Sequence, residues 1–126
     1  NNLGTVYQAA GEYARALDLF NRALFINSDI GNEEGQSANL NNIGGVSLRL
    51  GKPQVAMEFF EKSLALEEKR KDPKGQALRF NNIGRAYRAL GQEDRALEFY
   101  LKARKLNEEI SNLSGLADNL NNLGAV

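Results

Sequence analysis

The chain has 126 residues and carries 16 basic and 16 acidic side chains, so it lacks the broad positive field of a typical nucleic-acid-binding protein. It contains neither cysteine nor histidine, which excludes a disulfide framework and removes the commonest general base and the commonest metal ligand. No apolar run approaches the roughly 18 residues of a membrane span, and no signal-peptide pattern is present.

A repeat organises the whole sequence. The block NNLG at residues 1–4 returns as NNIG at 41–44 and 81–84 and as NNLG at 121–124. Self-similarity at a fixed period of this size is the signature of a solenoid. We therefore expect one all-α domain over residues 1–126, a right-handed superhelical solenoid of antiparallel helix pairs. It should contain repeats 1–40, 41–80 and 81–120, a partial fourth at 121–126 and about seven helices, and be a fragment of a longer array that is truncated at both ends.

The first predicted boundary lies at Gly11, which recurs as Gly51 and Gly91. Glycine accepts a positive φ without strain, so each is expected to end one helix and open a tight turn to the next. The helix that follows each glycine has one apolar face with helical spacing. This face comprises Ala16, Leu17, Phe20, Ala23 and Leu24, then Ala56, Met57, Phe60, Ser63 and Leu64, then Ala96, Leu97, Tyr100 and Ala103.

A second column predicts where the next helix of each repeat begins. Asn32, Asp72 and Asn112 are residues that favour the N-cap position, and Pro73 fits the first helical position after Asp72. We expect this helix to run, for example, from Glu33 to Leu50. Its core face should hold Ile43, Val46 and Leu50, with counterparts Leu3, Val6 and Tyr7 and counterparts Ile83, Ala86, Tyr87 and Leu90.

Glycines also recur inside this second helix, as Gly4, Gly44 and Gly84. A glycine in a helix interior costs roughly 1 kcal/mol relative to alanine. Their return at one phase of each repeat predicts a close crossing of two helices with their backbones nearly touching. Glycines three residues after each N-cap repeat this pattern nearer the helix start, as Gly35, Gly75 and Gly115.

These columns resemble the tetratricopeptide repeat. The residues that carry the resemblance are Leu3, Gly4, Tyr7, Gly11, Ala16, Phe20 and Ala23, and Ile83, Gly84, Tyr87, Gly91, Ala96, Tyr100 and Ala103, whereas the middle copy departs at Ser47 and Ser63. The period is longer than the usual 34 residues, and the closing proline is replaced by Ser28, Glu68 and Glu108. This longer form is similar to repeats of kinesin light chains, Gα-binding polarity adaptors and bacterial signalling regulators. The resemblance implies a scaffold that binds peptide segments along a concave groove.

The resemblance also implies which side chains face that groove. Asparagines two positions before the helix glycine commonly hold a peptide backbone or a carboxylate, and an amide offers both a donor and an acceptor. The matching residues are Asn2, Asn42, Asn82 and Asn122, and beside them lie Asn1, Asn41, Asn81 and Asn121. The alternative is that these asparagines tie one helix to the next and bind no ligand.

Arginines follow the asparagines along the same helix. Arg49, Arg85 and Arg88 would make the second half of the groove cationic and suited to carboxylates, with Arg79 near the same stripe. The alternative is that they are merely solvated. A basic cluster of Lys69, Arg70, Lys71 and Lys74 is more typical of a solubilising corner.

The predicted function is therefore a cytoplasmic protein–protein interaction scaffold that binds a peptide or helical segment, possessing no catalytic residue, metal site or cofactor. The partner is expected to be another protein, acidic where it meets the arginines, and neither nucleic acid nor membrane. Catalysis is disfavoured because carboxylates such as Glu58, Glu61, Glu67 and Glu68 fall on presumed outer faces. Two alternatives stay open. The chain could be the sensing part of a larger signalling regulator, or a structural solenoid that associates end to end through Leu3, Val6, Leu120, Leu123 and Val126.

Overall fold

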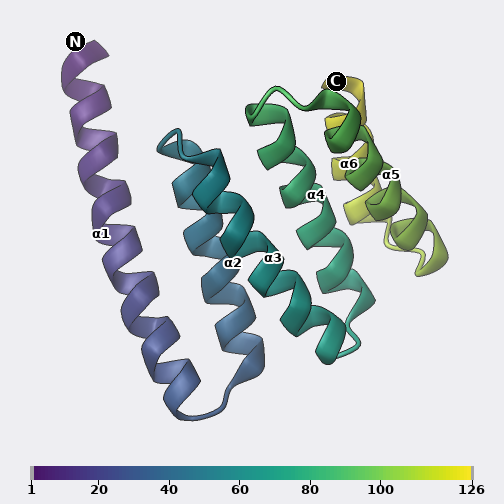
Figure 1. Ribbon diagram of the computed structural model, residues 1–126, viewed down its shortest axis with the longest axis horizontal. Coiled ribbons are helices and arrows are strands. Elements are labelled where there is room, and N and C mark those ends of the chain that lie inside the picture. Colours follow the sequence, from purple (N-terminus) through teal and green to yellow (C-terminus); the bar gives the residue numbers. More distant parts are fainter. Residues whose placement is uncertain (1, 126) are drawn as a thin grey trace.

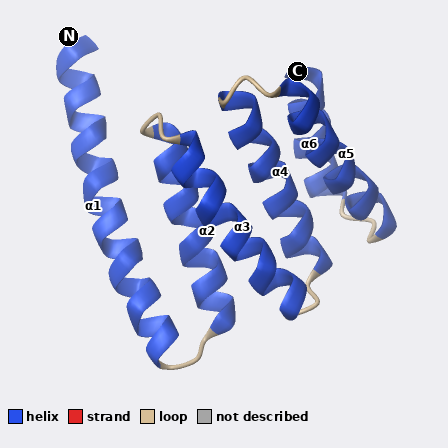
Figure 2. Ribbon diagram, viewed as in Figure 1, coloured by secondary structure: helices blue, strands red, loops and turns tan. Residues whose placement is uncertain are grey.

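The computed structural model describes residues 2–125, with side chains for residues 11–117 and 119–124. Within residues 2–125 the chain is a row of six helices without a strand, and successive links lie alternately at opposite ends of the helices (Figures 1 and 2). The helices are α1 (Asn2–Asp29), α2 (Glu33–Arg49), α3 (Pro53–Lys69), α4 (Pro73–Ala89), α5 (Glu93–Glu109) and α6 (Leu113–Ala125).

The forty-residue period has a simple structural origin. Helices α2 to α5 each contain 17 residues, and three residues link each helix to the next. Two helices and their two links therefore make up one repeat of forty residues. We call α2, α4 and α6 the inner helices, and α1, α3 and α5 the outer helices. The prediction of tandem antiparallel helix pairs is confirmed.

The predicted N-caps are also confirmed. The side chains of Asn32, Asp72 and Asn112 accept hydrogen bonds from the backbone N–H three residues on, at 3.1, 3.2 and 3.3 Å. That third residue is glycine because the end of the preceding helix lies against it. A Cβ at Gly35 would come within 2.6 Å of the Asn27 side chain, and one at Gly115 within 2.7 Å of Asn107 Oδ1.

The close crossing predicted at the interior glycines is present, but its cause differs in detail. A Cβ at Gly44 would lie 2.6 Å from the Phe60 ring, and one at Gly84 would lie 2.5 Å from the Tyr100 ring. The nearest backbone atom at Gly44 is the carbonyl oxygen of Ala56, at 3.2 Å from that position. The missing side chain therefore makes room chiefly for an aromatic ring of the next helix.

The predicted turn at Gly11 is wrong, since α1 continues through it as one helix of 28 residues. The chain accordingly has six described helices where about seven were expected. Gly51 and Gly91 do turn, both with φ +77°. A single glycine lowers helix stability by only about 1 kcal/mol, so it does not end a helix unless the following helix docks back. The pairs α2–α3 and α4–α5 dock in this way.

The array is concave on the side of α2, α4 and α6. Among the described residues, α2 contacts α4 and α4 contacts α6, whereas α1 does not contact α3 and α3 does not contact α5. The inner helices are therefore closer together than the outer ones. A buried cluster of Ala56, Met57, Phe60, Ile83 and Ala86 joins α3 to α4 behind this surface. This arrangement fixes the side chains of the inner helices on a stable concave wall.

Candidate functional site

Three adjoining hollows lie on the concave side, with volumes of about 390, 330 and 350 Å³. Arg85 lines all three, and Asn82 and Leu78 line the first two. We refer to these hollows together as the groove. Of the residues predicted for a binding groove, those that line it are Asn41, Asn42, Asn81, Asn82, Asn122, Arg49, Arg85 and Arg88; Asn121 lines it as well. The side chains of Asn1 and Asn2 lie outside the described residues.

The asparagines divide into two kinds by their hydrogen bonds. Asn82 Nδ2 donates to Asn41 Oδ1 of the preceding inner helix at 2.7 Å. Asn119 Nδ2 donates to Asn81 Oδ1 at 2.9 Å, and Asn81 is buried. The column of Asn41 and Asn81 therefore ties inner helices together, as one of the two hypotheses proposed. Asn42 is exposed in the groove.

Three arginine side chains are exposed along the groove. Arg49, Arg85 and Arg88 have no ion-pair partner among the side chains of residues 11–117 and 119–124. Arg85 Nη1 makes only a long hydrogen bond of 3.5 Å to Asn82 Oδ1. Exposed guanidinium groups without an ion-pair partner have N–H donors available to bind a carboxylate through two parallel hydrogen bonds.

The groove has two halves, the first next to α2 and the second next to the C-terminal half of α4, and they differ at matched positions of the repeat. Gly45, Leu48 and Phe60 in one repeat correspond to Arg85, Arg88 and Tyr100 in the next. Burial raises the pKa of the Tyr100 hydroxyl above its usual value, and the positive charges of Arg88 and Arg85 oppose this shift. The hydroxyl has no hydrogen-bond partner among the described side chains.

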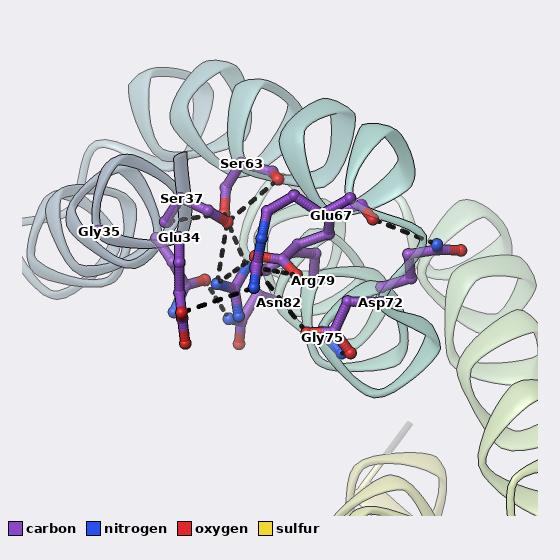
Figure 3. Close-up of polar contacts among 12 residues, drawn as sticks. Glu34, Gly35, Ser37, Ser63, Glu67, Asp72, Gly75, Arg79 and Asn82 are labelled. Carbon is purple, nitrogen blue, oxygen red and sulfur yellow. Dashed lines mark hydrogen bonds and ion pairs between the residues drawn. The ribbon is translucent and has the colours of Figure 1, made fainter. Parts of the chain in front are cut away.

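A buried polar network lies beside the groove where α2, α3 and α4 meet (Figure 3). Ser63 Oγ donates to the Ser37 carbonyl oxygen at 2.8 Å, and the two hydroxyl oxygens lie 2.9 Å apart. Arg79 reaches between them and donates from Nε to Ser63 Oγ at 2.6 Å and from Nη2 to Ser37 Oγ at 3.2 Å. Three helices are thus joined through one guanidinium group.

The charge of Arg79 is balanced by Glu67. Arg79 Nη2 lies 3.5 Å from Glu67 Oε1, and Arg70 Nη1 lies 3.1 Å from Glu67 Oε2. Burial lowers the pKa of Arg79 below its usual value, while the negative charge of Glu67 opposes the shift. The expectation for Glu67 was wrong, since it is only 2% exposed instead of lying on an outer face. Arg79, expected near the stripe of groove arginines, is 7% exposed and is bound within the network.

A signal for this network was present in the repeat. The column of Asn27, Glu67 and Asn107 lies twelve residues before the column of Asn39, Arg79 and Asn119. Asn27 Nδ2 donates to Asn39 Oδ1 at 2.7 Å, so these columns contact each other. An acid and a base that replace two amides together in one repeat indicate a contact between them.

In the basic cluster at the α3–α4 link, two of the four residues, Lys69 and Arg70, are paired with carboxylates. Lys69 lies 3.2 Å from Glu33, and Arg70 contacts Glu67, Glu34 and Asp72. Partial burial of Asp72 favours its neutral form, but the Gly75 N–H and the Arg70 charge outweigh this effect. The pKa of Asp72 therefore lies below its usual value. These contacts favour a structural role for this corner.

Two other kinds of site are absent from the described part of the chain. None of the helices there combines the length and apolar character that a bilayer span requires. Likewise, the residues described do not bring together three or more His, Cys, Asp or Glu side chains as metal ligands.

Comparison with solved structures shows the fold of this chain in longer proteins. It aligns with the crystal structure of BtubC (BKLC) from P. vanneervenii at a TM-score of 0.81 and 22% identity, over 98% of this chain and 51% of that one. It also aligns with nearly identical TPR-like repeats attributed to a kinesin light chain of Podosopora anserina, at a TM-score of 0.70 and 21% identity. That alignment covers 98% of this chain and 64% of the other. The chain thus spans between half and two thirds of these structures.

Family models identify the repeat itself. Two models described as tetratricopeptide repeat match residues 1–69 and 77–119. Among curated proteins, no sequence matches the chain. Tetratricopeptide repeats generally mediate protein–protein interactions, and such scaffolds are typically not enzymes. The first match alone covers more than half of the chain, and the chain belongs to the tetratricopeptide repeat family.

Proposed function

We propose that this chain is a cytoplasmic, non-catalytic scaffold whose groove binds an extended or helical segment of a partner protein. The observation that carries the proposal is the clustering of exposed amide and guanidinium groups along one concave wall. Asn42, Asn82, Arg85 and Arg88 come from two neighbouring inner helices, so one segment could contact all of them. Concave surfaces of repeat proteins bind extended partners in this way.

The amides suit the main chain of the bound segment. Asn82 donates one N–H to Asn41, but an amide side chain has a second N–H and two acceptor positions on oxygen. Asn42 contributes its side chain from an exposed position. Main-chain recognition needs no single side-chain sequence, so the part of the groove lined by Asn42 and Asn82 is suited to orient the segment.

The arginines suit acidic side chains of the bound segment. Arg85 and Arg88 replace Gly45 and Leu48 of the previous repeat and bring two positive charges to the same part of the groove. Neither arginine is neutralised by a described carboxylate within 4 Å. An acidic stretch of a partner is therefore the expected occupant of the second half.

A peptide-library screen with the intact chain tests this proposal. We expect hits with clustered Asp or Glu whose affinity falls in Arg85→Ala/Arg88→Ala and depends strongly on salt. The matched control is Arg95→Ala/Arg104→Ala, which removes the same charge from exposed positions of the outer helix α5. Equal losses of affinity in the two double variants would show a general charge effect and contradict a groove site.

A pair of asparagine variants separates binding from stacking. Asn42→Ala should weaken peptide binding with little change in the free energy of unfolding, because its side chain is exposed. Asn82→Ala should lower both the affinity for the peptide and the free energy of unfolding, because it also loses the hydrogen bond to Asn41. If Asn42→Ala binds every hit normally, the asparagines serve only to tie helices together.

A further inference from the structure

Three columns of the repeat change together in the second half of the groove. These columns hold Gly45, Leu48 and Phe60 in one repeat and Arg85, Arg88 and Tyr100 in the next. The three replacements meet in one hollow of about 350 Å³. We call this hollow, lined by Leu48, Arg85, Arg88, Ala89, Tyr100 and Asn122, the arginine pocket. The combined change adds two positive charges and one hydroxyl group to a single place in the groove.

The hydroxyl group of Tyr100 is not needed for packing. Tyr100 is fully buried, and its hydroxyl oxygen has no hydrogen-bond partner among the described residues. A buried donor without a partner destabilises a folded chain. The ring of Phe60 lies against Gly44 as the ring of Tyr100 lies against Gly84, so phenylalanine fills the equivalent space without this cost. The hydroxyl is therefore a donor for which the described residues supply no acceptor.

The two arginines bring unbalanced charge to the same pocket. Arg85 and Arg88 are one turn apart on α4, and both side chains are exposed. No carboxylate of the described side chains lies within 4 Å of either guanidinium group. Both arginines are near enough to Tyr100 for their charges to oppose the rise in the pKa of its hydroxyl. The arginine pocket thus has two positive charges and no acidic residue in its lining.

A phosphoryl group matches this combination better than a single carboxylate does. On a modified serine, threonine or tyrosine it carries a charge of about −1.5 to −2 near neutral pH and has three acceptor oxygens. One carboxylate carries a single negative charge on two oxygens. The charge of two guanidinium groups is therefore balanced by one phosphoryl group, and the third oxygen is left to accept from a further donor.

We propose that the arginine pocket binds a phosphorylated side chain of the segment held in the groove, so that phosphorylation of the partner strengthens binding. Arg85 and Arg88 bind the phosphoryl oxygens, and Tyr100 donates its hydroxyl hydrogen to one of them. Because both arginine side chains are exposed, they can rearrange around the ligand and give it access to the buried hydroxyl. This inference rests on the proposed function, since the groove must first bind a segment of a partner protein.

A screen of degenerate peptides with one fixed central residue tests the proposal with the whole chain. The central residue is phosphoserine or phosphotyrosine in the first set, the unmodified residue in the second and glutamate in the third. We expect the best phosphorylated peptides to bind about tenfold more tightly than the same sequences with glutamate. Equal affinities would overturn this inference and leave acidic binding in the groove intact. A chain that binds none of the three sets would contradict the proposed function as well.

The pH dependence of binding separates a phosphoryl group from a carboxylate. The second pKa of a phosphoryl group is about 6, whereas that of glutamate is about 4.3. The ionisable residues lining the pocket are Arg85, Arg88 and Tyr100, and none of these types ordinarily titrates near pH 6. The affinity of a phosphorylated hit should therefore fall by about tenfold between about pH 7.5 and about pH 5, while that of its glutamate version stays nearly constant. Parallel pH profiles for the two peptides would contradict the proposal.

A conservative variant tests the part played by Tyr100. Tyr100→Phe introduces the residue found at Phe60, so the chain should stay folded and lose about tenfold in affinity for the phosphorylated hit. The matched control is Tyr87→Phe, because Tyr87 stacks on Phe99 and does not line the pocket. It should bind normally. Equal affinities of the two variants would overturn the assignment, and so would inorganic phosphate alone binding as tightly as the phosphorylated peptide, which would indicate a site for a free anion.

Discussion

The α1–α2 joint and the α3–α4 joint use the same two columns and hold them together with different chemistry. At the first, Asn27 donates to Asn39 at 2.7 Å, and two amides satisfy each other. At the second, Glu67 and Arg79 lie 3.5 Å apart, both nearly without solvent exposure. One backbone arrangement therefore accepts a neutral pair or an ion pair.

The ion pair differs from the amide pair in what it requires around it. Arg79 needs Ser37 and Ser63 as acceptors, and these columns hold alanine at Ala23, Ala77 and Ala103. Glu67 also accepts from Arg70. Buried charges are costly unless paired and hydrogen-bonded, so the serines and the ion pair form one unit. Otherwise similar repeats are therefore distinguished by sets of buried polar residues.

The largest expected effect on the free energy of unfolding comes from removing one partner of the buried ion pair. Arg79→Ala leaves the carboxylate of Glu67 buried beside a single arginine, and loss of one partner of a buried pair costs about 3–5 kcal/mol. Chemical denaturation followed by circular dichroism measures the free energy of unfolding. Converting the joint to its counterpart with Glu67→Asn/Arg79→Asn should restore most of that loss. A double variant as unstable as Arg79→Ala would show that the two joints are not interchangeable.

Two adjacent glycines give the next largest effect, in opposite directions. Gly44→Ala pushes a methyl group into the Phe60 ring and should destabilise the chain by about 1–3 kcal/mol. Gly45→Ala meets no atom within 4 Å and should stabilise α2 by about 1 kcal/mol, because alanine is the better helix former. Thermal unfolding of the two variants gives the comparison directly. If both change the melting temperature equally, the ring contact does not explain Gly44.

A smaller effect is expected where the aromatic column changes from Phe60 to Tyr100. Tyr100→Phe removes a buried hydroxyl without a described partner, so it should leave stability unchanged or raise it by about 1 kcal/mol. Because the pKa of Tyr100 is raised in the folded state, the native chain should lose stability as the pH rises through the usual tyrosine pKa of about 10 and on through the folded-state value. The variant should lose less over that range, as measured by denaturation at several alkaline pH values. An identical alkaline decline in both would contradict this cause.

The smallest effect concerns the one acidic N-cap. The pKa of Asp72 is lowered in the folded state, so the stability it contributes is present above the unfolded pKa of about 3.9 and is lost as the pH falls through the folded-state value. Asp72→Asn keeps the cap found at Asn32 and Asn112 and should flatten this acidic decline. Unfolding measured between neutral and acidic pH compares the two chains. A decline of unchanged slope in the variant would assign the pH dependence to other carboxylates.

The local parts of the structure were predictable from the sequence. The N-caps at Asn32, Asp72 and Asn112 and the turns at Gly51 and Gly91 depend on a few neighbouring residues, which the repeat displays. The absence of a turn at Gly11 was not predictable, since glycine permits a turn but docking of the next helix decides whether it forms. The burial of Glu67 was missed because it too depends on a contact with another helix. A carboxylate on an amphipathic helix is usually solvated, and only its partner on α4 explains its burial.

The groove was predictable in part. The resemblance named the asparagines, the arginines follow them along the same helix, and the structure places those with described side chains along three adjoining hollows. The sequence did not show that Asn81 is buried and hydrogen-bonded to Asn119, because that contact joins residues 38 positions apart. The contrast between Gly45 and Arg85 is visible in the repeat alone.

The central proposal is that the groove binds an acidic segment, and mapping where such a peptide binds tests it most directly. Backbone amide shifts in two-dimensional NMR, followed during titration with the best acidic peptide, report the contact surface. We predict that the changes concentrate on α2, α4 and α6, around Asn42, Arg85 and Asn122. Changes centred on α3 and α5, or on the basic corner at Lys69–Lys74, would contradict the groove as the binding site.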